Sequence, residues 1–149
     1  MKLEVILNDT TMTYDLTELG VKYSGVVNIG QKCKQVWNTI AVESESVDPF
    51  QCHLIGSGES WRLIEGQNRT ECPKGLLSSK LVPCNGCLGR CVNIHAGRPK
   101  YYLRDPETPT LVNGEKVGQW GTEIKSGDLI SFGNVKINVI SERKFYSIA

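Results

Sequence analysis

The sequence has few of the residues on which catalysis depends. Its 149 residues include only two histidines, His53 and His95, and no nucleophile motif, phosphate-binding loop or pair of catalytic carboxylates stands out. His53 falls inside an expected β-strand, where a histidine is usually a hydrogen-bonded structural residue. We therefore expect a protein that is not an enzyme. The best enzymatic alternative is a thiol-redox protein built on Cys84 and Cys87, which would need an accessible cysteine of low pKa.

Long hydrophobic runs are also absent. No apolar stretch approaches the roughly 20 residues that a membrane-spanning helix needs. The N-terminal segment, MKLEVILNDTT, carries an acid where a signal peptide has its apolar core. These absences predict a cytoplasmic protein without membrane contact. In that compartment thiols stay reduced, and clustered cysteines bind metal more often than they pair as disulfides.

A strong net charge is lacking, although the charges are unevenly distributed. The formal net charge of +1 argues against a nucleic-acid-binding surface over the whole protein. Between residues 69 and 105 there are seven basic and two acidic residues (+5), whereas the rest of the chain has ten basic and fourteen acidic residues (−4). A basic segment on an acidic body suggests a binding partner. A solvated loop kept soluble by its lysines explains the charges equally well.

Sustained helical periodicity is missing as well. No window repeats apolar residues every 3.6 positions, and Gly, Ser, Asn and Pro recur roughly every 8–12 residues, which is typical of an all-β sandwich of short antiparallel strands. Alternating or β-branched runs predict strands at residues 2–7, 12–19, 26–29, 39–42, 51–55, 61–64 and 135–140. The strongest hairpin signal is Asn113-Gly114, because Asn-Gly fits a type I′ turn. The length of the chain suits one domain over residues 1–149.

Four of the six cysteines are concentrated between positions 72 and 91, at C-x11-C-x2-C-x3-C spacing. Cys84 and Cys87 would form the short knuckle of a tetrahedral zinc site, with Cys91 and Cys72 as further ligands and His95 in reserve. The spacing is not that of a standard zinc finger, so free or disulfide-paired thiols and an iron–sulfur site remain alternatives. We expect a structural Zn²⁺, because an all-cysteine site leaves no open coordination position for catalysis.

Four stretches of the chain resemble the forkhead-associated (FHA) domain family: VVNIGQ, ESWRLIE, LVNGEKV and IKSGDLISFGNVKINV. The similarity spans roughly residues 2–140, with residues 67–108, which contain the cysteine cluster, as an irregular insertion. The resemblance implies an FHA-like (SMAD/FHA) β-sandwich of eleven strands that binds phosphothreonine peptides through the loops at one end. It also places the inserted segment at that end, where a metal would replace the hydrophobic core that the segment lacks.

The positions that would contact the phosphate in this family are mostly replaced. The glycine–arginine pair usual after the third strand is Gly30-Gln31, and the usual serine and histidine correspond to Asp48 and Gln51. The usual Asn-Gly-Thr appears as Thr108-Pro109-Thr110. A phosphothreonine carries about −1.5 to −2 charge and is bound best by a guanidinium fork. Gln31 brings no charge, and Asp48 brings a like charge.

Two sets of residues are therefore candidates for partner binding, one near the expected loops and one in the inserted segment. They are Gln31, Lys32, Lys34, Asp48, Arg98, Lys100 and Tyr101. Lys32 and Lys34 would replace the missing arginine as point charges. The aromatic–basic stretch around Tyr101 would take a peptide, a phosphate or single-stranded nucleic acid. Alternatively, Gln31 and Asp48 are plain loop residues, and residues 101–103 form a strand packed on the sandwich.

Three functions are compatible with the sequence. We expect the first, a non-catalytic FHA-like protein-interaction module with a zinc-closed recognition loop and a protein or peptide partner, phosphorylated or not. The second is a zinc-knuckle nucleic-acid-binding protein, which a steep salt dependence of RNA or DNA binding would indicate. The third is a redox-responsive module whose thiols pair reversibly on oxidation.

Overall fold

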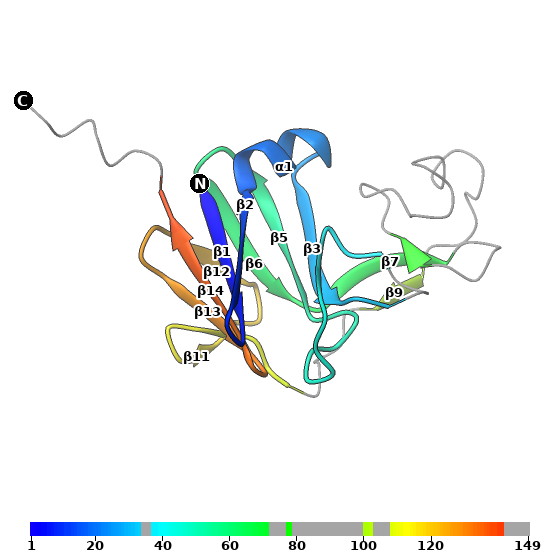
Figure 1. Ribbon diagram of the computed structural model, residues 1–149. Helices are drawn as coiled ribbons and strands as arrows, with labels where there is room; N and C mark the ends of the chain where they lie inside the picture. Colours follow the sequence, from blue (N-terminus) through cyan, green and yellow to red (C-terminus); the bar gives the residue numbers. More distant parts are fainter. Residues whose placement is uncertain (34–36, 72–76, 79–99, 103–107, 142–149) are drawn as a thin grey trace, which may run out of the picture.

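Two β-sheets packed face to face form the body of the protein. The structure, a computed structural model, describes residues 1–33, 37–71, 77–78, 100–102 and 108–141. One short helix, α1 (Leu16–Lys22), lies at one end of the sheets (Figure 1). One sheet has six strands: β1 (Lys2–Leu7), β2 (Thr10–Asp15), β10 (Leu111–Val112), β11 (Glu115–Lys116), β13 (Leu129–Phe132) and β14 (Val135–Ile140). The other has five: β3 (Val26–Gln31), β4 (Ile40–Val42), β5 (Cys52–Ser57), β6 (Ser60–Glu65) and β12 (Thr122–Ile124).

The strand order joins distant parts of the chain. The six-stranded sheet has the order β11-β10-β13-β14-β1-β2, so the last strand pairs with the first, from Lys2–Ile140 to Leu7–Val135. The five-stranded sheet has the order β12-β6-β5-β3-β4. Within the sandwich described here, β3 and β4 form the single parallel pair, and the other pairs are antiparallel. The prediction of an all-β sandwich is therefore confirmed.

The strand directions place several connections at one end of the sandwich, which we call the loop end. Because β3 and β4 run parallel, both strands end there, and β5 and β10 begin there. The turns that follow β1 and β13 lie at the same end. The loop end therefore consists of residues 8–9, 31–33, 43–51, 66–67, 108–110 and 133–134. The helix α1 and the β5–β6 turn lie at the opposite end (Figure 1).

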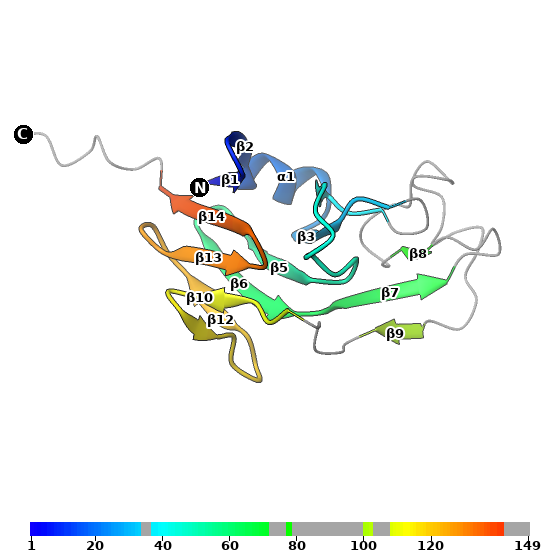
Figure 2. The same cartoon turned by 60° about the horizontal axis from the view of Figure 1, so that its bottom comes forward.

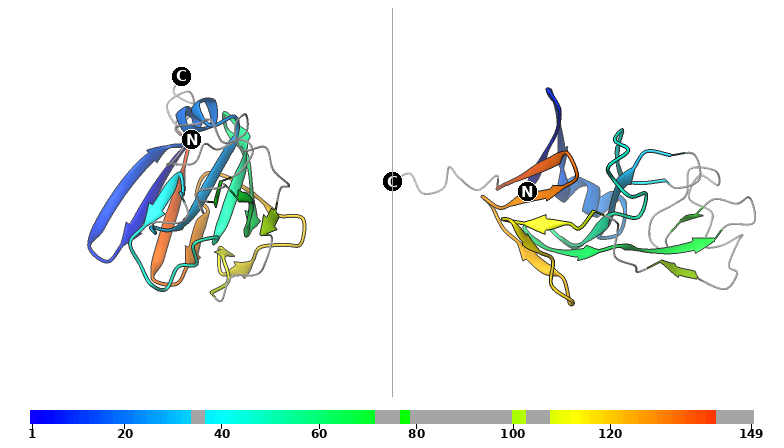
Figure 3. Two further views of the ribbon diagram at one scale, coloured as in Figure 1. Left: turned by 90° about the vertical axis from the view of Figure 1, so that its right-hand side faces the viewer. Right: turned by 90° about the horizontal axis from the view of Figure 1, so that it is seen from below.

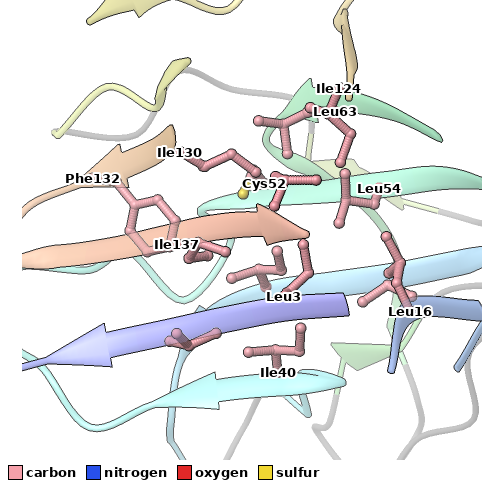
Figure 4. Close-up of a cluster of buried hydrophobic side chains, with 14 of the residues drawn as sticks. Leu3, Leu16, Ile40, Cys52, Leu54, Leu63, Ile124, Ile130, Phe132 and Ile137 are labelled. Carbon is pink, nitrogen blue, oxygen red and sulfur yellow. The ribbon is translucent and has the colours of Figure 1, made fainter. Parts of the chain in front are cut away.

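The core fills the space between the two sheets. Every second side chain of β14 is buried, and in β1 Leu3 and Val5 are buried in the same alternation, as strands with one face on the core require. Fully buried residues from both sheets, including Leu3, Leu54 and Ile137, point into the same space (Figure 4). Each such side chain contributes about 1.5–3 kcal/mol relative to an exposed one, so the sandwich is a firm frame for the loop end.

The predicted strands are mostly confirmed, but the strand predicted over residues 12–19 is confirmed only for residues 12–15, and residues 16–19 are helical. The strand β2 ends at Asp15, whose carboxylate caps α1 by accepting a hydrogen bond from the Glu18 backbone N at 3.2 Å. Gly20 lies inside this helix, where a Cβ would come 2.8 Å from the Trp61 ring. A helix of seven residues is shorter than the window over which helical periodicity can be recognised, so the sequence pattern predicted a strand instead. Among the described residues, no helix has the length and hydrophobicity to cross a bilayer.

The Asn113-Gly114 hairpin is confirmed. Asn113 and Gly114 join β10 to β11 with φ angles of 53° and 83°. Two successive positive φ values are what a type I′ turn requires. The Asn113 side chain also accepts a hydrogen bond from the Leu129 backbone N at 2.9 Å and donates one to Asp128 at 3.0 Å. The hairpin is thereby tied to the start of β13.

A third, smaller sheet extends from the loop end, and we call it the arm. It consists of β7 (Gln67–Glu71), β8 (Leu77–Ser78) and β9 (Lys100–Tyr102), with β7 in the middle. Figures 1 and 2 show these strands running away from the sandwich. The segment 67–108 is thus not irregular throughout, contrary to expectation. Residues 101–102 do form a strand, but it pairs with β7 and not with a strand of the sandwich.

The arm begins directly after β6. Gly66 separates β6 from β7, and its carbonyl oxygen lies 2.7 Å from Nδ1 of the buried His53. The prediction that His53 is a hydrogen-bonded structural residue is confirmed. That residues 67–108 are an insertion stays a prediction.

Candidate partner-binding site at the loop end

Gln31 and Asp48, the two replaced phosphate-contact positions, lie beside each other at the loop end. The Gln31 backbone N donates to the Asp48 carbonyl at 3.1 Å. The Gln31 side chain donates through Nε2 to the Ser44 carbonyl at 3.1 Å. The Asp48 carboxylate accepts from the Phe50 backbone N at 2.8 Å. Both side chains thus hold the connection between β4 and β5 in shape, and neither presents a cationic donor.

Gly30 allows this connection to come close to β3. A Cβ at Gly30 would lie 2.3 Å from the Pro49 carbonyl oxygen and 2.8 Å from Asn38 Nδ2. Asn38 is buried and donates to the same Pro49 oxygen at 3.0 Å. Glycine is therefore required at position 30 because the backbone of another loop occupies the space of a side chain.

Gln51, at the position of the usual histidine, is fully buried and connects two loops. Its Oε1 accepts from the Asp48 backbone N at 3.1 Å. Its Nε2 donates to the Thr108 carbonyl at 2.8 Å and to the Thr110 hydroxyl oxygen at 2.9 Å. The β4–β5 connection is thereby fixed to the point at which the chain returns from the arm. The sequence contains no signal for this role beyond the family resemblance.

A contact between Glu65 and Thr110 closes the base of the segment 67–108. The Thr110 backbone N donates to Glu65 Oε2 at 2.9 Å, and the Thr110 hydroxyl donates to Glu65 Oε1. Thr110 is fully buried. Although the two residues are 45 positions apart, they bring the end of β6 and the start of β10 together. We call Gln51, Glu65 and Thr110 the clasp.

Gln67, the first residue of the arm, is anchored inside the protein. Its side chain is fully buried. Its Nε2 donates to the Ile29 carbonyl at 2.8 Å, to Asn38 Oδ1 at 2.7 Å and to the Cys52 carbonyl at 3.1 Å. The β3–β4 loop, the sandwich and the arm therefore share one buried polar group. Gln67, Glu65 and the contacts of the clasp were not predicted, because a polar residue in the sequence does not reveal its burial.

Most of the charged side chains among the described residues of the loop end are negative. Lys32 Nζ lies 3.1 Å from Glu43 Oε1, and both side chains are largely exposed. An exposed pair of this kind contributes about 0–1 kcal/mol, so it leaves the lysine accessible to a partner. Glu45 and Asp48 add two further negative charges in the same connection. A dianionic phosphate would therefore meet one lysine and three carboxylates among the described residues 31–33 and 43–51.

Comparison with known proteins identifies the fold. No protein-family model matches the sequence, and a search of curated proteins finds no match. Solved structures, in contrast, match over most of the chain. The FHA domain of the CT664 protein from Chlamydia trachomatis has a TM-score of 0.53 at 9% sequence identity, over 94% of this chain and 95% of that one. The fold is that of an FHA domain.

Two other FHA structures have bound partners. The yeast Dun1 FHA domain, in complex with a doubly phosphorylated peptide derived from Rad53 SCD1, has a TM-score of 0.53 at 10% identity, over 99% of this chain and 81% of that one. The FhaA FHA domain, complexed with the intracellular domain of Rv3910, has a TM-score of 0.51 at 16% identity, over 91% and 97%. At such identities the likeness establishes the FHA fold alone. The expected eleven strands are present, six in one sheet and five in the other.

Of the other predicted site residues of this FHA-like domain, only Lys100 and Tyr101 are among the described residues. The expected metal ligands Cys72, Cys84, Cys87, Cys91 and His95, together with Lys34 and Arg98, are outside the described residues. Lys100 and Tyr101 are placed in β9. In the part of the chain that is described, no group of three or more His, Cys, Asp or Glu residues could hold a metal ion. Among the candidates that the structure describes, Gln31, Lys32 and Asp48 lie together at the loop end.

Proposed function

We propose that this FHA-like domain is a non-catalytic protein-interaction module whose loop end binds a protein or peptide without depending on phosphothreonine. The fold supports a binding role, because the Dun1 and FhaA domains of the same fold are in complex with a peptide and a protein domain. The observation that carries the proposal is that Gln31 stands where the family usually has an arginine. Its neutral side chain is engaged with the Ser44 carbonyl, and Asp48 stands next to it.

The electrostatic cost of a phosphate supports the same conclusion. Two like charges 4 Å apart repel by roughly 1 kcal/mol in water and about 4 kcal/mol at an effective dielectric constant of 20. A phosphothreonine beside Asp48 would meet this repulsion without the guanidinium fork that normally offsets it. Lys32 supplies a single flexible charge that Glu43 already shares. An unphosphorylated segment avoids the repulsion and can still pair with Lys32 and the polar groups of the loops.

Paired peptide arrays test this proposal, with each sequence present in a phosphothreonine and an unphosphorylated form. The wild-type domain should bind a subset of sequences with less than a twofold difference between the two forms. The double variant Gln31→Arg, Asp48→Ser restores the residue types usual in the family and should gain at least a tenfold preference for phosphothreonine, or about 1.4 kcal/mol. Lys22→Gln, at the opposite end of the sandwich, is the matched control and should leave the binding pattern unchanged.

Two results would count against the proposal. A wild-type preference of tenfold or more for phosphothreonine, equivalent to about 1.4 kcal/mol, would show that this domain recognises the phosphate without an arginine at position 31. Unchanged peptide binding after Lys32→Glu and Asp48→Lys would place the partner elsewhere on the domain.

We further propose that Zn²⁺ closes the outer part of the segment 67–108 through Cys72, Cys84, Cys87 and Cys91, with His95 in reserve. The spacing of the thiols supports this site. The pairing of β7 with β9 also supports it, because both ends of the segment enter it as neighbouring strands. A cytoplasmic location, where thiols stay reduced, belongs to the same proposal.

Metal analysis with thiol counting tests the zinc site. Protein purified without chelator should contain one Zn²⁺ per chain, and four thiols should become reactive only after a chelator removes the metal. The double variant Cys84→Ser, Cys87→Ser should lose the metal, whereas Cys33→Ser should retain it. Metal-free protein with reversible disulfides would support the redox-responsive alternative instead.

A further inference from the structure

The strand β2 differs from the other edge strands of the sandwich. The edges β4 and β12 have three residues each, and β11 has two, so they offer little backbone for pairing. β2 has six residues and pairs with β1 without a bulge from Lys2–Asp15 to Leu7–Thr10. On its other side no described strand pairs with it, and it lies at the margin of the sheet (Figure 3). Soluble proteins usually protect such edges with lysine, proline or bulges, and TTMTYD has none of them.

The backbone groups that β2 presents outward can be identified from its pairing with β1. The Leu16 backbone N donates to the Met1 carbonyl at 2.8 Å, so residue 16 points toward β1. In an antiparallel ladder the residues of a strand alternate between the two neighbouring sides. Tyr14 and Met12 therefore also pair toward β1, whereas Thr11 and Thr13 direct their N–H and C=O groups away from the sheet. The Asp15 N–H points outward as well.

The side chains of β2 show that the core is incompletely covered at this edge. Met12 and Tyr14 pair with Val5 and Leu3, so they lie on the face of the sheet that covers the core. Even so, 55% of Met12 is exposed. Tyr14 is half-buried, and desolvation raises its pKa. A further strand beside β2 would satisfy the outward backbone groups and cover Met12 in one step.

We propose that β2 pairs antiparallel with β2 of a second copy of this chain, about a two-fold axis at Thr13. In this register Thr13 faces Thr13 of the second copy, and Thr11 faces Asp15, so the outward backbone groups meet each other. Met12 and Tyr14 of the two copies then alternate on the core-facing side. Centring the axis on Met12 instead would place Asp9 opposite Asp15 twice, which is unfavourable for like charges. The inference is independent of what binds at the loop end.

The geometry also predicts the size and arrangement of this dimer. One strand from each copy forms a small interface, below the roughly 800 Å² per partner of a standard one, so the dimer should be weak. A two-fold axis closes the assembly at two copies and prevents further growth. Because the paired strands run in opposite directions, the two loop ends point away from each other, and each remains open to a partner.

Sedimentation velocity of the full chain from about 5 to about 500 µM tests the dimer, since a weak interface shows itself as concentration-dependent mass. The wild-type protein should move from monomer toward dimer over this range and stop there. Thr13→Pro removes an outward N–H that β1 does not use and should reduce association at least tenfold. Thr13→Val keeps the N–H and should associate as the wild type does, which separates backbone pairing from side-chain effects.

Charge variants at the axis test the register itself. Thr13→Lys and Thr13→Glu each place like charges opposite each other in a dimer, so each protein alone should remain monomeric. An equimolar mixture should form a heterodimer at least tenfold more tightly than either protein alone self-associates. A wild type that stays monomeric at every concentration would overturn the proposal. So would association that continues beyond the dimer, or a mixture no tighter than its components.

Discussion

The buried thiol of Cys52 should make the stability of the protein depend on alkaline pH. Burial raises the pKa of Cys52 far above its ordinary value, and the nearby Glu65 carboxylate raises it further. The folded protein therefore keeps this thiol protonated at pH 10, whereas the unfolded chain releases the proton at about pH 8.5. A pKa that is raised on folding stabilises the protein fully below the unfolded value, and this contribution is lost as the pH rises above it.

The expected decrease in the free energy of unfolding follows from the difference between the assay pH and the pKa of Cys52 in the unfolded chain. Between pH 7 and pH 10, deprotonation of Cys52 in the unfolded chain should lower the free energy of unfolding by about 2 kcal/mol, at about 1.4 kcal/mol per pH unit above 8.5. In Cys52→Ala this group is gone, so the variant should lose about 2 kcal/mol less than the wild type over the same interval. Contributions from Tyr14 and the other cysteines are common to both proteins and cancel in the comparison.

Urea unfolding under reducing conditions, followed by tryptophan fluorescence at pH 7 and pH 10, measures the pH-dependent decrease in the free energy of unfolding for the wild type and for Cys52→Ala. The cavity that Cys52→Ala creates lowers stability at both pH values and does not enter the difference. Ile29→Val is the matched control: it also shortens a fully buried side chain but carries no titrating group, so its pH-dependent loss should equal that of the wild type. If Cys52→Ala and the wild type lose the same free energy, Cys52 is not a protonated, desolvated thiol in the folded protein.

Three further substitutions test the contacts that hold the loop end, each by urea titration. Thr110→Val removes the hydroxyl that binds Glu65 and should lower the free energy of unfolding by about 1–3 kcal/mol, whereas Thr110→Ser should lower it by less than about 1 kcal/mol. Equal decreases would show that the hydrogen bond between Thr110 and Glu65 does not stabilise the protein. Gln67→Leu leaves buried oxygens without a donor and should lower the free energy of unfolding by about 2–4 kcal/mol. A decrease below about 1 kcal/mol would show that the Gln67 amide is dispensable for stability. Asn113→Ala, at a φ of 53°, should cost about 1–2 kcal/mol, with Asn113→Gly less costly because glycine tolerates the angle.

The strands of the sandwich could be predicted because their signals are local. In β14, Val135, Ile137 and Val139 alternate with exposed or half-buried positions, and this pattern alone defines the strand. Asn113-Gly114 specified its turn in the same way. The helix α1 could not be predicted, since its seven residues contain too few turns to show a period and are recognised only by the Asp15 cap.

Less of the candidate site could be predicted from the sequence. The family resemblance located Gln31 and Asp48, and the structure places them next to each other. Their hydrogen-bond partners could not be predicted, because those contacts depend on how separate loops meet. The contact of Glu65 with Thr110 joins residues 45 positions apart, and neither residue type signals it. The same holds for Gln67, whose burial depends on a loop that follows β3.

The clasp has a consequence for how this domain can vary. Since Glu65 and Thr110 touch, the intervening stretch leaves and rejoins the sandwich at a single point. The entropy of closing a loop grows only slowly with its length, so lengthening, shortening or exchanging the part of this stretch beyond the buried Gln67 costs the body of the domain little. A lineage of such domains can therefore acquire new binding specificities by grafting different appendages onto one unchanged sandwich.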